Sequence, residues 1–281
     1  MVQQLYYYEP NVIAAGIFAG IFLLSGIIHF VQMCRTKTWY CSLLAIGVTM
    51  EVIGYSSRIP SSRDPKAVVP YMIQSVDVLV APVLYAAAIY IIFCRLITKI
   101  EGQKHSIIRI SRLTLIFVLG STCTFTLQAF GASFEAGALS HGAHAGQHII
   151  VAGLAFQFFF LGLFIVAAVI FHTRMRMRSS PTTAAQTSEQ DEAPVSWRKM
   201  FWVLYVASLL ITSRSVFRLI EYVQELQGGL HGGVLRKEVW LYAFDASPMA
   251  LTTLLFNWYH PSRTVFKTGG EKPDILATES V

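Results

Sequence analysis

Three charged side chains interrupt a long apolar segment in the last third of the 281-residue chain. Arg214, Arg218 and Glu221 follow the spacing i, i+4, i+7, in a run that starts near Met200 and is long enough to cross a bilayer. On an α-helix this spacing places them within about 60° of one face. A charge at membrane depth costs about 2.5 to 3.5 kcal/mol, so this face must meet protein partners or water. Two interpretations stay open: an ion-pair clamp between helices, and one wall of a polar pocket for a charged ligand.

A second stripe with the same spacing occurs earlier in the chain. Glu51, Tyr55 and Arg58 lie at i, i+4 and i+7 of another apolar segment. Isolated polar residues in further apolar segments are predicted at a similar depth, in the outer half of the membrane: Gln74, Asp77, Gln128 and Asp245. Unrelated structural charges would scatter in depth, so the shared level predicts one connected ligand-binding site. Its four acids and three bases sum to −1, which favours a ligand with an amine head group.

Histidines form a separate candidate site. His144 and His148 have the i, i+4 spacing that places two imidazoles on one helical face for a metal or a haem. The alternative is a Gly- and His-rich loop without a ligand, and we expect no resident cofactor. The sequence has no G-x-S-x-G nucleophile motif and no phosphate-binding glycine loop, so we do not expect an enzyme.

Composition indicates a membrane protein. Hydrophobic residues make up 54% of the chain and charged residues 14%, whereas a soluble globular protein carries about 25% charged residues. The formal charge of +6 comes from basic residues beside apolar runs and not from a basic stripe, so nucleic acid is not an expected partner. The expected partners are membrane lipids and an amphiphilic lipid ligand, and the oligomeric state is left open.

Seven segments are long enough to span a bilayer, which predicts an all-α polytopic membrane protein. We expect residues 1–260 to form the seven-helix domain, with a disordered connection over 172–197 and a short polar tail over 261–281. Pro82 and Pro248 are predicted to kink their helices. The segments are Asn11–Met33, Tyr40–Ser57, Tyr71–Ile97, Ile110–Gly131, Gln147–Phe171, Lys199–Ile220 and Val239–Tyr259.

Basic residues predict the orientation of these segments. Of the 22 Lys and Arg residues, fifteen flank connections on one side, five flank connections on the other, and Arg214 and Arg218 lie within the sixth segment. Cytosolic loops carry the excess of Lys and Arg. The N-terminus is therefore predicted outside and the C-terminus in the cytosol, together with the 172–197 connection.

Several of these segments resemble the fungal RTA-like family, also called lipid-translocating exporters. The resemblance covers nearly the whole chain and is carried by GVTMEVIGYSSRIPS, YMIQSVDVLVAPVLYAAAIY, SRSVFRLIEYVQ and EVWLYAFDASPM. It implies a seven-helix plasma-membrane protein linked to resistance to toxic amphiphiles such as sphingoid long-chain bases and aminosterols, and in some members to porphyrin transport. The family's elements fall on Glu51, Gly54, Tyr55, Arg58, Gln74, Asp77, Pro82, Gln128, Gly131, Arg214, Arg218, Glu221, Tyr222, Asp245, His260 and Pro261.

Three functions are compatible with this pattern. The first is a transporter that exports amphiphilic lipids from the plasma membrane, or from an internal membrane. The second is a seven-helix receptor or sensor, which would use the same pocket. The third is haem or porphyrin transport through the outer histidines. If the protein is a transporter, we expect Asp77 or Asp245 to bind the ammonium group of the amphiphile, while the arginines orient these acids.

Overall fold

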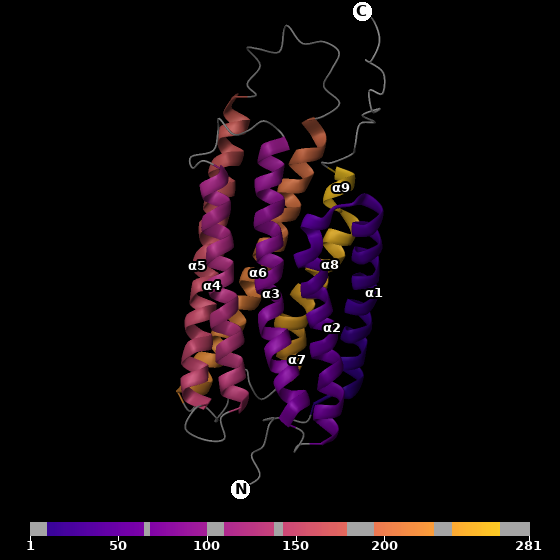
Figure 1. Cartoon of the computed structure of the whole chain (residues 1–281), viewed down its shortest axis with the longest axis vertical. Helices are drawn as coiled ribbons and strands as arrows, with labels where there is room; N and C mark the ends of the chain where they lie inside the picture. The colour runs from indigo at the N-terminus through magenta and orange to yellow at the C-terminus, as the bar shows by residue number, and fades with distance from the viewer. Residues whose placement is uncertain are drawn as a thin grey trace, which may run out of the picture.

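The chain folds into a bundle of long helices that lie side by side along one axis (Figure 1). The computed structural model describes residues 10–64, 68–99, 110–137, 143–178, 194–227 and 238–264. Those residues contain no β-strand, which confirms the all-α prediction. The elements are α1 (Val12–Thr36), η1 (Trp39–Cys41), α2 (Ser42–Arg63), α3 (Val68–Lys99), α4 (Ile110–Gly137), α5 (Ala143–Arg178), α6 (Pro194–Leu226), α7 (Glu238–Leu241), η5 (Tyr242–Ala246), α8 (Ser247–Trp258) and α9 (Pro261–Thr264).

Among the described residues, six stretches of helix are apolar and long enough to cross a membrane, so the protein is a multi-pass membrane protein. They are α1, most of α3, α4, α5 and α6, and the continuous stretch from α7 to α8. The predicted second span corresponds to α2, which lies between α1 and α3 in the bundle but is less apolar because it carries Glu51 and Arg58. Seven crossings and the side on which each terminus lies remain predictions.

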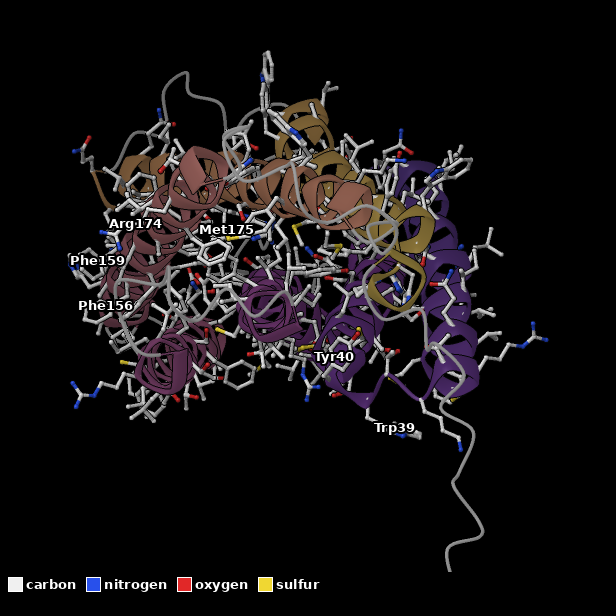
Figure 2. The ribbon with its side chains drawn as sticks, turned by 90° about the horizontal axis from the view of Figure 1, so that it is seen from above. Trp39, Tyr40, Phe156, Phe159, Arg174 and Met175 are labelled. Atoms are coloured by element: carbon white, nitrogen blue, oxygen red, sulfur yellow. The ribbon has the colours of Figure 1, made fainter. Side chains whose placement is uncertain are left out.

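Helix α3 forms the centre of the bundle. It packs against α2, α4, α5 and α6, and in the view along the bundle the other long helices lie to its left, to its right and above it (Figure 2). In its most apolar 18-residue window 72% of the residues are buried, against 28% to 50% in the other spans. Peripheral side chains point outward instead: Phe156 and Phe159 of α5 are 46% and 63% exposed, as expected for a surface that meets lipid.

The last span is not a continuous α-helix. The backbone N–H of Ser247 bonds to the carbonyl of Tyr242, five residues earlier, so Tyr242–Ala246 form a π-helical turn. Pro248 follows directly and has no N–H to continue the α-helical ladder. Ser247 Oγ also donates to the Tyr242 carbonyl over 2.7 Å. A π-helical turn thus ends just before Pro248, where a kink was predicted, whereas α3 stays α-helical through Pro82.

The predicted 172–197 connection begins later and ends earlier than expected. Helix α5 continues to Arg178 and α6 begins at Pro194, so helix replaces both ends of the predicted loop. Apolar periodicity marks only the membrane-embedded part of a helix, which is why polar extensions at its ends escape a sequence pattern. Residues 179–193 and the tail beyond Thr264 lie outside the described part of the chain.

Small residues let α4 and α5 approach closely. A Cβ placed on Gly146 would lie 2.5 Å from the backbone nitrogen of Glu135, and one placed on Gly131 would lie 2.9 Å from that of Ile150. Real Cβ atoms do not come this close to backbone, so only glycine allows the contact. Close backbone approach at small residues is a common means of packing helices in membranes.

This contact predicts opposite effects for two glycines on the same helix. Gly146→Ala should destabilise the bundle by about 1 to 3 kcal/mol because the backbones must separate. Gly162→Ala is the matched control, since its added Cβ has no neighbour within 4 Å, and alanine gains up to about 1 kcal/mol of helix propensity. Thermal unfolding of both variants in detergent measures the difference. Equal melting temperatures would contradict the packing described here.

The orientation gives a second prediction. A protease-cleavable tag after residue 281 should be protected in intact cells and cut only after permeabilisation, because the excess of Lys and Arg places the C-terminus in the cytosol. A tag placed before residue 1 is the control and should be cut in intact cells. Cleavage of the C-terminal tag without permeabilisation would reverse the topology.

Candidate functional site

Asp245 lies at the centre of a buried ion-pair network. Its Oδ1 is 2.6 Å from Arg214 Nε, and its Oδ2 is 2.6 Å from Arg218 Nη2. Asp245 and Arg214 are both 0% exposed, and Arg218 is 13% exposed. The carboxylate therefore faces two guanidinium groups from consecutive turns of α6, and it is the π-helical turn η5 that carries Asp245.

Each arginine has one further partner. Arg218 Nη1 donates to Glu221 Oε2 over 2.9 Å, three residues along the same helix. Arg214 Nη2 donates to the backbone carbonyl of Val78 on α3. These contacts join α6, α3 and the last span at one level of the bundle. Both arginines of the α6 stripe thus pair with Asp245 of the last span, which is the ion-pair clamp between helices, whereas Glu221 pairs within its own helix.

A second ion pair joins α2 to the start of the last span. Arg58 Nη2 lies 2.8 Å from Glu238 Oε1, and Tyr242 donates to the same oxygen over 3.1 Å. The backbone N–H of Asn11, which caps α1, donates to Glu238 Oε2 over 2.7 Å. Glu238 was not among the predicted site residues. It lies just before the predicted span Val239–Tyr259, in the first turn of its helix, where an acid is common.

The remaining acids predicted for the pocket do not form ion pairs within the described residues. Glu51 is 1% exposed, and both its carboxylate oxygens lack a hydrogen-bond donor. Asp77 is half-buried on α3, and its Cβ would lie 3.4 Å from a Cβ added to Gly54 of α2. Glu51 interacts electrostatically with Arg214, Arg218, Asp245 and Asp77, so it belongs to the same charged cluster.

Aromatic rings of α1 pack against tyrosines beside this cluster. Tyr55 stacks on Phe22 at a centroid distance of 5.5 Å, and Phe18 stacks on Tyr242 at 5.2 Å. Arg58 lies 5.9 Å from the centroid of the Tyr242 ring, within reach of a cation–π interaction. Tyr242 therefore contacts the aromatic group and the Arg58–Glu238 pair together.

The other predicted site residues lie away from the ion pairs. Gln128 of α4 donates to Gln157 Oε1 of α5 over 2.7 Å, both side chains being buried. Gln74 is half-buried on α3, one turn before Asp77. His144 and His148 are exposed in the first turns of α5, and among the described residues no three His, Cys, Asp or Glu side chains form a group that could hold a metal.

A further buried acid was not predicted. Glu135 of α4 accepts from Gln147 Nε2 at 3.2 Å and from Tyr222 OH at 3.5 Å. These contacts connect α4, α5 and α6 beside the close glycine contact. Glu135 lies four residues beyond the predicted span Ile110–Gly131, where an acid is ordinary, so nothing in the sequence pattern singled it out.

An apolar cavity of about 320 Å³ lies between α2, α3 and α4. Its wall includes Val118, which is 43% exposed, so the cavity reaches the surface of the bundle that meets lipid. Hydrocarbon side chains form nearly all of the lining, including Leu43, Leu84, Ala87, Ile91, Phe117 and Phe125.

The central carboxylate should matter more for stability than the peripheral one. Asp245→Asn leaves the buried Arg214 without a counter-charge and Arg218 with Glu221 alone, which should cost about 3 to 5 kcal/mol of unfolding free energy. Glu221→Gln is the matched control. Glu221 is 17% exposed and pairs with Arg218 alone, so the loss should stay within about 1 kcal/mol. Unfolding of both variants in detergent measures the difference, and equal losses would show that Asp245 does not organise the network.

Comparison with known proteins places this arrangement in a family. Residues 44–268 match the family model described as RTA1 like protein. The chain is 32% identical to Protein RTA1 of Saccharomyces cerevisiae, over 94% of this chain and 87% of the relative. It is 35% identical to Protoporphyrin uptake protein 1 of the same yeast, over 75% of this chain and 65% of the relative.

A more distant relative carries a lipid in its name. The chain is 24% identical to Sphingoid long-chain base transporter RSB1 of S. cerevisiae, over 83% of this chain and 67% of the relative. No solved structure matches the chain. The family model and Protein RTA1 both cover most of the sequence, and from this coverage we conclude that the chain belongs to the RTA1-like protein family.

Proposed function

We propose that the protein is a translocator of amphiphilic lipids with an amine head group, and that it acts in the plasma membrane without catalysing a reaction. The observation that carries this proposal is a buried charged cluster beside an apolar cavity that reaches the lipid-facing surface. A polar head and a hydrocarbon tail need these two environments within one molecule. Relatives named for lipid and sphingoid-base transport support the same substrate class.

Charge balance favours an amine over an anionic head group. Arg214 and Arg218 are matched by Asp245 and Glu221, and Arg58 is matched by Glu238. The acids that remain outside these pairs are Glu51 and Asp77. The cluster therefore has surplus negative charge and no surplus arginine, which suits an ammonium group.

The ion pairs favour Glu51 over Asp245 as the acid that binds the amine in this proposal. Both oxygens of Asp245 already face guanidinium groups, so an ammonium would have to displace a buried ion pair. The role of Asp245 in the proposal is to fix the two arginines beside Glu51.

The proposal predicts that the amine itself is recognised. A charge-assisted hydrogen bond contributes about 1.5 to 3 kcal/mol, so a sphingoid base should bind about 10- to 150-fold more tightly than its N-acetylated analogue. Binding of both compounds to purified protein in nanodiscs measures the ratio. Equal affinities for the sphingoid base and its N-acetylated analogue would show that the site does not recognise the amine.

Movement distinguishes a translocator from a receptor. Liposomes that contain the protein should transfer a fluorescent sphingoid base between leaflets faster than empty liposomes, whereas a receptor would bind it without transfer. Protoporphyrin is the competitor to include, because one relative is named for its uptake. Binding of protoporphyrin without binding of the amine would favour the porphyrin function instead.

A further inference from the structure

Five buried polar atoms around Glu51 have no hydrogen-bond partner in the described part of the chain. They are Glu51 Oε1 and Oε2, Tyr55 OH, Tyr85 OH and Arg214 Nη1. The four residues that carry them are at most 1% exposed. Glu51 interacts electrostatically with Arg214, Tyr55 and Tyr85, so the atoms belong to one cluster formed by α2, α3 and α6. Buried polar groups are satisfied in most proteins, and several unsatisfied groups together mark a place where polar chemistry occurs.

Glu51 is also the buried acid whose charge the ion-pair network leaves unmatched. The two arginines of α6 are balanced by Asp245 and Glu221, so an ionised Glu51 adds one negative charge to a neutral group. A buried carboxylate without a counter-charge costs several kcal/mol. The remaining neighbour, Asp77, is an acid as well and offers no compensation. One positive charge from a mobile source would neutralise Glu51.

The apolar cavity lies on the same side of α2 as Glu51. Leu43, Gly47 and Glu51 are spaced four residues apart, so they follow one stripe of the helix, and Leu43 lines the cavity. Eight residues separate Leu43 from Glu51, which is about 12 Å along a helix. Between them the ring of Tyr85 packs against Gly47, since a Cβ on that glycine would lie 3.2 Å from the ring. A single amphiphile can therefore place its head at Glu51 and its tail in the cavity once the Tyr85 ring moves.

We propose that Glu51 holds a proton and the ammonium group of the amphiphile in alternation, so that the protein exchanges protons for amines. This inference rests on the proposed function and adds that a proton is the ion exchanged for the amphiphile. In the exchange the carboxylic acid loses its proton to water, and the carboxylate then pairs with the incoming ammonium. One positive charge enters as one leaves, so the charge of the buried cluster stays constant. Tyr85 OH and Arg214 Nη1 are donors of the same cluster without a hydrogen-bond partner among the described residues, and in the proposed exchange they are available to Glu51.

Proton release on binding tests the exchange directly. Calorimetric titration of the protein in nanodiscs, in two buffers of equal pH and different ionisation enthalpy, gives the number of protons released. Wild type should release about one proton for each sphingoid base bound, and affinity should rise about tenfold per pH unit while Glu51 is protonated. An N-trimethylated analogue, whose charge is fixed, should release the same number, which shows that the proton comes from the protein.

Two variants locate the source of the proton. Glu51→Gln should remove the release and the pH dependence, because the amide carries no exchangeable acid proton. Glu135→Gln is the matched control, because Glu135 of α4 is a buried acid that accepts from Gln147 and Tyr222 and takes no part in the ion pairs, and this variant should release protons as wild type does. Binding of both amines by wild type without proton release overturns the exchange while leaving the proposed function intact, and this result needs no variant to fold. Release that persists in Glu51→Gln also overturns it, and failure of wild type to bind either amine overturns both proposals.

Discussion

The double ion pair of Asp245 with Arg214 and Arg218 is the interaction on which the rest of this structure depends. Two guanidinium groups cannot stay inside an apolar bundle without negative charge beside them. The carboxylate reaches both because a π-helical turn interrupts the last span at Tyr242–Ala246. Such turns shift the direction of the side chains they carry, and they are frequent at functional sites. The irregular backbone is thus tied to the placement of one aspartate.

The central position of α3 lets this network influence the whole bundle. Arg214 donates to the Val78 carbonyl of α3, and the same helix supplies Asp77 and Tyr85 to the charged cluster and Leu84 and Ala87 to the apolar cavity. A displacement of α3 relative to α2 would therefore change the polar and the apolar environment together. That coupling is what movement of an amphiphile requires, since its head and tail must be released in concert.

The charged residues divide into two groups with different roles. Arg58, Glu238, Arg214, Arg218, Asp245 and Glu221 form balanced pairs that link helices. Glu51, Tyr55 and Tyr85 are at most 1% exposed, and their side-chain oxygens have no hydrogen-bond partner in the described part of the chain. The ion-pair clamp between helices is thus present, and the pocket that we propose around Glu51 adjoins it. Asp245 and the Val78 carbonyl hold Arg214 in place, and Arg214 Nη1 has no hydrogen-bond partner among the described residues.

The sequence by itself determined the class of the protein, most of its helices and the identity of the buried charges. Apolar length and the cost of charge in a membrane are local properties, so they can be read without a fold. Which charges pair was decided only by tertiary structure, because the partners lie on different helices. Asp245, which lies in the π-helical turn, pairs with both Arg214 and Arg218, and Arg58 pairs with Glu238, 180 residues away along the chain. The carboxylate oxygens of Glu51 have no hydrogen-bond partner among the described residues. The spacing of residues along a helix determines which face a side chain lies on. Which residue that side chain contacts depends on the rotation and the depth of the neighbouring helix.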